Sequence, residues 1–181
     1  MSDDLRNKLG AAYRQLMFEY PFFYTMLLMM QRIEAPDVTE TMATDGKNLY
    51  YNPAFVEKLT AAEVAGVLAH EALHVALLHL DRILYRNLSD WNWATDEVVN
   101  YHIRDARLTL PSNCVPGVEN ATAEERYTLR QQQKGSGKGG SKAQWNVGGI
   151  VLPKDAQGKP LTEQQSKEWI DDIKLRVSRA M

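Results

Sequence analysis

The 181-residue sequence contains a single cysteine, Cys114. One thiol cannot close a disulfide within the chain, and neither its neighbours nor a second thiol suggest redox or metal chemistry. We therefore expect Cys114 to be a small buried or half-buried residue without a chemical role.

The sequence also lacks an excess of charge of one sign. It carries 21 Lys and Arg residues against 23 Asp and Glu residues, which gives a formal net charge of −2 at pH 7. Nucleic acids are polyanions and select strongly basic surfaces. This balance therefore disfavours a nucleic-acid partner.

Long hydrophobic runs are missing as well. The most apolar segment, PFFYTMLLMM at residues 21–30, is shorter than the roughly twenty residues that a membrane-spanning helix needs. We expect it to form a core helix with Pro21 in the first turn, and we expect no membrane partner.

Residues 1–8 are acidic and polar, whereas a secretory signal is basic and then apolar, so we expect a cytoplasmic protein.

The remaining composition is that of a globular protein, with 44% hydrophobic and 24% charged residues. We predict one domain over residues 1–130. Residues 131–143, QQQKGSGKGGSKA, have no apolar anchor and are predicted to be a flexible linker. Residues 144–181 are predicted to end in a helix from about Thr162. That helix has no Gly or Pro stop before Met181, which suggests a processing boundary or a further segment packed there, and it is a candidate surface for a protein partner.

The order of the predicted elements favours an α+β fold that is mostly helical. Helices are predicted over about 4–19 and 21–33, followed by extended segments at 39–45 and 48–51. Asp45-Gly46 between the extended segments is a hairpin-turn signal, so we expect a small β-hairpin or sheet beside the next helix.

That next helix carries the most informative motif of the chain, His70-Glu71-Ala72-Leu73-His74. Residues four apart share one face of a helix, so both imidazoles can bind one cation while Glu71 reaches a water bound to it. Two neutral nitrogen ligands with an open position suit a catalytic zinc ion, Zn2+. Glu71 is then the predicted catalytic base, which takes the proton of the water and delivers it to the leaving amine.

The context of the motif argues against a chance match or a pair of hydrogen-bonded core histidines. The chain has only four histidines, and two of them have this spacing. The surrounding helix, predicted over about 60–84, begins with a capping box formed by Thr60 and Glu63. It is apolar on nearly all sides, as a buried central helix requires.

Such a site needs a third protein ligand. On a continuous helix His79 is rotated by about 180° from His70 and faces away, so its expected role is structural. A metzincin would have glycine at Leu77 and histidine at Leu80, which excludes that class.

Two adjacent carboxylates in the next predicted helix, residues 89–108, are the candidates for the third ligand. Asp96 shares a partly apolar stripe with Asn100, whereas Glu97 lies on a different face. A carboxylate on an inward stripe needs a cation or a partner to offset its desolvation, so Asp96 is favoured over Glu97. Asn100 is expected to orient Asp96 through a hydrogen bond.

Several short motifs in a fixed order resemble a family of metallopeptidase domains found beside von Willebrand A-like domains in bacterial and phage proteins. They cover roughly residues 10–130 and comprise Thr44-Asp45-Gly46, Leu49-Tyr50-Tyr51-Asn52-Pro53, Ala69 to His74, His79 with Arg82, Trp91-Asn92-x-Ala94-x-Asp96 with Asn100, and Ala123-Glu124-Glu125 with Tyr127. No von Willebrand A-like portion follows within this chain.

The resemblance implies a zincin-like fold in which zinc lies on His70, His74 and an acidic third ligand matching Asp96. It implies that Glu71 is the catalytic base, and it supplies Tyr127 as a candidate donor to the oxyanion formed during hydrolysis.

In zincin-like folds a strand beside the active-site helix hydrogen-bonds an extended substrate. The candidate for this substrate edge lies just upstream of the helix and consists of Thr41, Met42, Ala43 and Thr44. An equally weighted alternative is a plain hairpin that braces the helix.

The sequence therefore favours a zinc-dependent endopeptidase acting on a polypeptide substrate. The alternative is a non-catalytic, metal-stabilised interaction module in a phage or stress-response assembly. An open metal position facing a cleft would indicate the enzyme, and a closed shell of four protein ligands would indicate the module.

Overall fold

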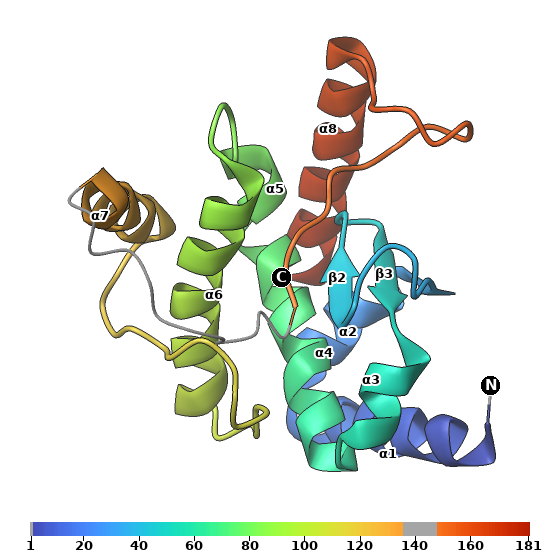
Figure 1. Ribbon diagram of the computed structural model, residues 1–181. Coiled ribbons are helices and arrows are strands. Elements are labelled where there is room, and N and C mark those ends of the chain that lie inside the picture. Colours follow the sequence, from blue (N-terminus) through green and yellow to red (C-terminus); the bar gives the residue numbers. More distant parts are fainter. Residues whose placement is uncertain (1, 136–147) are drawn as a thin grey trace.

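The computed structural model describes residues 2–135 and 148–181 (Figure 1). In these ranges helices pack with a small sheet that lies at one side of the molecule (Figure 1), which confirms the predicted α+β fold. The helices are α1 (Asp3–Glu19), α2 (Pro21–Leu28), α3 (Pro53–Lys58), α4 (Ala61–Ala76), α5 (His79–Arg82), α6 (Leu88–Asp105), α7 (Ala123–Gly135) and α8 (Glu163–Ala180). The strands are β1 (Gln31–Glu34), β2 (Met42–Thr44) and β3 (Asn48–Tyr51).

The strands run in the order β1-β3-β2, so β2 lies at one edge of the sheet. β2 and β3 form the predicted antiparallel hairpin, with Thr44 opposite Leu49. Its turn is fixed by Gly46, whose φ is +89°, and by the Asp45 carboxylate. That carboxylate accepts the backbone N–H groups of Lys47 and Asn48, at 3.0 and 2.7 Å.

The helix predicted over residues 21–33 is wrong at its end, where the structure has a strand. α2 stops at Leu28, and residues 31–34 form β1, which pairs in parallel with β3. The apolar run continues to Met30, so sequence periodicity gives no boundary there. Pairing with β3 decides the conformation, and this tertiary contact cannot be read from the segment itself.

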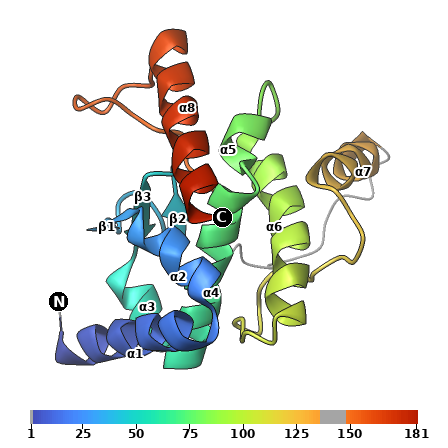
Figure 2. The same ribbon diagram turned by 180° about the vertical axis from the view of Figure 1, so that it is seen from behind.

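Helix α4 lies at the centre of the molecule. α1 and α2 pack against it on one side and α6 on another, and β2 also contacts it, as the two opposite views show (Figures 1 and 2). It begins with the predicted capping box of Thr60 and Glu63. Gly66 permits a close approach of the chain, because a Cβ there would lie 1.9 Å from the carbonyl oxygen of Thr109.

The continuous helix predicted over about 60–84 is wrong. α4 ends at Ala76, Leu78 has a left-handed φ of 54°, and α5 starts at His79 in a new direction. A left-handed conformation costs roughly 1–2 kcal/mol for a residue with a Cβ.

Two side chains stabilise this break by binding backbone carbonyls near it. Arg82 donates to the carbonyl of Leu77 at 3.1 Å, and the indole N–H of Trp91 donates to the carbonyl of His79 at 2.9 Å. Neither contact affects the spacing of apolar residues along the sequence, so the break could not be predicted from that spacing. The break is important because it reorients His79.

Ionic contacts hold α7 against α6. The Asp90 carboxylate accepts hydrogen bonds from three side chains of α7, those of Arg130, Gln131 and Lys134. Residues 131–135, at the start of the predicted linker, therefore belong to α7. The rest of that predicted linker, residues 136–143, lies outside the described residues.

The last part of the chain returns to the sheet before it forms α8. Residues 148–151 run beside the free edge of β2, and α8 then begins with a capping box of Thr162 and Gln165. α8 packs against α2 and α4. In the described ranges no helix combines the length and the hydropathy that crossing a membrane requires. The division of the chain at residue 130 stays a prediction.

Candidate metal centre

Helices α4 and α6 bring the three predicted ligands together in the core. The Nε2 atoms of His70 and His74 lie 2.8 Å apart. Oδ1 of Asp96 lies 3.5 Å from Nε2 of His70 and 3.2 Å from Nε2 of His74. One potential ligand atom from each residue falls within 4.8 Å of the others. All three side chains, and that of Glu71, are 0% exposed.

The neighbouring carboxylate, Glu97, points elsewhere. It forms a bidentate ion pair with Arg126 of α7, at 2.7 and 3.0 Å. Adjacent residues on a helix diverge by about 100°, and the structure brings Asp96 and not Glu97 to the histidines.

Asn100 was expected to orient Asp96, but in the structure it contacts His70 instead. Its Nδ2 donates to the Val115 carbonyl at 2.8 Å, which turns Oδ1 toward Nδ1 of His70, also at 2.8 Å. An amide oxygen only accepts, so Nδ1 of His70 carries the proton. In the neutral ring, Nε2 is then left with a free lone pair. The expectation was wrong because helical spacing shows which residues share a face but not which way each side chain bends.

His79 does not face away from the motif, which corrects the expectation from a continuous helix. The break at Leu78 turns it back, so that its Nδ1 lies 3.0 Å from Nδ1 of His74. Burial, followed by the nearby positive charge that His74 can carry, lowers the pKa of His79 well below its usual range. A neutral His79 can accept the Nδ1 proton of His74, and this leaves Nε2 of His74 with a free lone pair.

Burial and mutual charge set the protonation of the cluster. Burial raises the pKa of Glu71 to about 8 and lowers the pKa of His74. Burial opposes the charged forms of Asp96 and His70 as well, but the attraction between them outweighs it. The pKa of Asp96 is therefore lowered and that of His70 is raised. The cluster thus favours a positive charge beside Asp96, which a proton or a metal cation can supply.

Unpaired atoms in the cluster test whether a cation fits. Both carboxylate oxygens of Asp96 and Oε2 of Glu71 are buried without a hydrogen-bond partner among the described residues, because the contacts of Asp96 with the imidazoles lack hydrogen-bond geometry. Buried carboxylates without donors are costly. With their Nδ1 protons held by Asn100 and His79, His70 and His74 direct two lone pairs toward the same carboxylate. Two imidazole nitrogens and a carboxylate form a donor set that suits zinc.

A glycine pair that the sequence reading left without a role lies directly on Glu71. The N–H of Gly149 donates to Oε1 of Glu71 at 3.2 Å. A Cβ on Gly148 would lie 1.7 Å from the same oxygen and 2.8 Å from a ring carbon of His70. Only glycine fits so close to the motif. The Gly-Gly pair inside an apolar stretch was the sequence signal for such a close approach.

The segment predicted to be a substrate edge contains an edge strand, and this strand is covered at Thr44. Thr41, Met42, Ala43 and Thr44 are all buried, and residues 42–44 form the edge strand β2. Thr44 is hydrogen-bonded on its outer side to residues 149–151. β2 is therefore an edge strand of the three-stranded sheet, and its outer hydrogen bonds at Thr44 are already used by the chain itself.

Tyr127, the candidate oxyanion donor, lies on α7. Its hydroxyl accepts the backbone N–H of Asn87 at 3.1 Å, and its ring packs edge-on against Trp91. The structure records no contact between Tyr127 and Glu71 or the ligand cluster among the described residues. These contacts indicate that Tyr127 fixes the start of α6.

The comparison with known families covers most of the chain. Residues 5–158 match the family described as "Putative metallopeptidase domain". The chain belongs to this family. Membership confirms the resemblance drawn from the short motifs. The matched part of the chain extends past residue 130 and includes Gly148 and Gly149. No curated protein and no solved structure matches the chain.

Proposed function

We propose that this protein is a zinc-dependent endopeptidase in which Glu71 is the catalytic base. The observation that carries the proposal is the convergence of His70, His74 and Asp96, with unpaired Asp96 oxygens, beside the buried Glu71 carboxylate. Membership in the metallopeptidase family supports the class of reaction.

Each side chain has a defined task in this proposal. His70, His74 and Asp96 hold the metal, and the ring contacts of Asn100 and His79 keep both Nε2 lone pairs directed toward it. Zinc held there would lower the pKa of a bound water to about 7 and polarise the peptide carbonyl.

Glu71 moves the proton. Burial favours the neutral form of Glu71, and the positive charge of a metal on His70, His74 and Asp96 would restore the ionised form. Its Oε2, which has no partner among the described residues, would then accept the proton of the attacking water. As the C–N bond breaks, the same carboxyl group delivers that proton to the departing nitrogen. The products are a new carboxylate and a new amine.

The substitution Glu71→Gln tests this proposal. Zinc-loaded protein is incubated with unfolded casein, cleavage is followed by mass spectrometry, and zinc content is measured by elemental analysis. We expect the variant to retain zinc and to lose about 10²- to 10⁴-fold in rate, because the amide cannot accept a proton. Glu97→Gln is the matched control and should keep both properties. Equal rates for wild type and Glu71→Gln would exclude Glu71 as the base.

One observation favours a second candidate, a metal-stabilised interaction module. The cluster and Glu71 are fully buried, as expected for a structural metal site. A protein that binds zinc, loses thermal stability when zinc is removed and cleaves no polypeptide would support the module.

A further inference from the structure

We propose that residues 148–151, Gly-Gly-Ile-Val, are a built-in strap that occupies the polypeptide-binding edge of the site and keeps the protein autoinhibited until it is displaced. The inference rests on the proposed peptidase function, because it names the regulation of that same site.

The strap takes the two backbone hydrogen bonds that Thr44 would otherwise offer to an extended polypeptide. The N–H of Thr44 donates to the Gly149 carbonyl, and the N–H of Val151 donates to the Thr44 carbonyl, both at 2.9 Å. Thr44 and Ile150 form a parallel bridge. A peptide that adds to a sheet edge is bound by main-chain hydrogen bonds of this kind. A substrate cannot pair with Thr44 while the strap is in place.

The strap also covers the catalytic base. Gly149 donates to Oε1 of Glu71, and the position of Gly148 leaves no space for a Cβ beside that oxygen. A carbonyl group to be hydrolysed has to approach the water that Glu71 activates. The backbone of the strap fills that approach, which agrees with the complete burial of Glu71.

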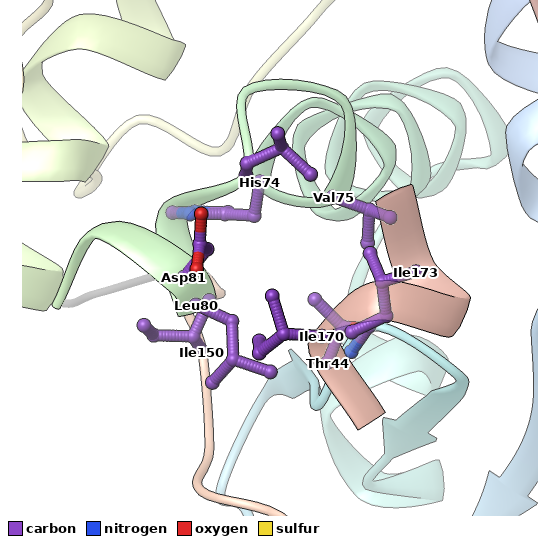
Figure 3. Close-up of a pocket in the computed structure, with 10 residues that line it drawn as sticks. Thr44, His74, Val75, Leu80, Asp81, Ile150, Ile170 and Ile173 are labelled. Atoms are coloured by element: carbon purple, nitrogen blue, oxygen red, sulfur yellow. The ribbon is translucent and has the colours of Figure 1, made fainter. Parts of the chain in front are cut away.

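Two anchors hold the strap. Asn92, one turn before Asp96 on α6, binds both backbone groups of Ile150: its Nδ2 donates to the carbonyl at 2.9 Å, and its Oδ1 accepts the N–H at 3.1 Å. The Ile150 side chain is 2% exposed and lines a small cavity together with His74 and Ile173 (Figure 3). A polar clamp and an apolar plug therefore fix the same residue.

Autoinhibition follows from these contacts as a population effect. Only molecules with the strap released can bind a polypeptide, so the observed kcat/KM equals its intrinsic value multiplied by the released fraction. A substitution that weakens an anchor without touching Glu71 or the metal ligands should raise that fraction and therefore the rate.

Asn92→Ala tests the strap, with Leu152→Ala as the matched control. Asn92→Ala removes two hydrogen bonds to Ile150, whereas Leu152 follows the strap and is 51% exposed. We expect Asn92→Ala to raise kcat/KM of the zinc-loaded protein on a fluorogenic casein peptide about tenfold or more. Leu152→Ala should leave kcat/KM unchanged.

Hydrogen exchange measures release of the strap without metal or substrate. The amides of Thr44 and Val151 should exchange about tenfold faster in Asn92→Ala than in wild type, with no change in Leu152→Ala. Unchanged exchange would overturn the proposal. Faster exchange together with a lower kcat/KM at full zinc content would also overturn it, since residues 148–151 would then be a wall of the active site and not an occupant.

A third readout separates failure of the strap from failure of the peptidase function. Acetohydroxamate is added to the cobalt-substituted proteins, and its binding to the metal is followed in the visible spectrum. Faster binding in Asn92→Ala than in wild type would support the strap even if neither protein cleaves casein. The lack of cleavage would then count only against the proposed peptidase function. Equal binding rates would overturn the strap.

Discussion

At the scale of single residues, Asp96 and Glu97 are neighbours in the chain with opposite surroundings. The Asp96 carboxylate is buried beside two imidazoles without a hydrogen bond among the described residues, whereas Glu97 is paired with Arg126. We predict that Asp96→Ala lowers zinc affinity by orders of magnitude and that Glu97→Ala changes it little, because only Asp96 can reach the metal. Competitive chelator titration of both variants checks this. A large loss in Glu97→Ala with Asp96→Ala near wild type would reverse the assignment.

His79 provides a second test at this scale. It contacts Nδ1 of His74, so His79→Ala should lower zinc affinity about 10- to 100-fold, the range typical of groups that orient a metal-binding ring. His102→Ala, a change at an exposed histidine, is the control and should have no effect. The same titration measures both variants. If His79→Ala binds zinc as tightly as wild type, His79 only fills space.

The pair of histidines and the neighbouring glutamate could be predicted because helix geometry alone places residues i and i+4 together. The choice of Asp96 over Glu97 followed from the same periodicity. The position of His79 could not be predicted, since it depends on the left-handed Leu78 and on hydrogen bonds from Arg82 and Trp91, which lie outside any local pattern. The roles of Gly148 and Gly149 could not be predicted either, because they depend on a contact between distant segments. Gly149 and Glu71, which form this contact, are 78 residues apart in the chain.

At the scale of elements, Asp90 determines how α7 packs on α6. Burial alone would raise the pKa of Asp90, but hydrogen bonds from Lys134, Gln131 and Arg130 outweigh it and lower the pKa to about 2. The ionised form is therefore favoured in the folded protein, and this contributes about 2 kcal/mol to the free energy of unfolding. The contribution is complete above about pH 4 and is lost as the pH falls toward about 2.

The corresponding prediction is that Asp90→Asn lowers the free energy of unfolding by about 2 kcal/mol at pH 7, and that the difference from wild type narrows below about pH 4. Urea unfolding at pH 7, 5 and 3 measures it. Asp171→Asn, a change at an exposed carboxylate of α8, is the control and should have little effect at any pH. A difference for Asp90→Asn that does not depend on pH would show that the ion pairs are not its cause.

Among the elements, capping boxes and the hairpin turn were predictable because their signals are local. Thr60 with Glu63 and Asp45-Gly46 are found as expected, and the last helix begins after Thr162, where its start was predicted. The strand β1 and the last turn of α7 were not predictable. β1 forms on β3, and residues 131–135 are helical beside Asp90, so in both cases a distant partner overrides the composition of the segment.

At the scale of the whole molecule, the proposed metal would join the two helices that carry the site. α4 supplies His70 and His74, α6 supplies Asp96, and the cluster lies where these helices meet within the core. Elemental analysis of zinc in the purified protein and in His74→Ala is the most direct test of this metal centre. We predict close to one zinc ion per chain in wild type and almost none in His74→Ala, because two ligands cannot retain the ion. Full zinc occupancy in His74→Ala, or none in wild type after reconstitution with zinc, would contradict the account.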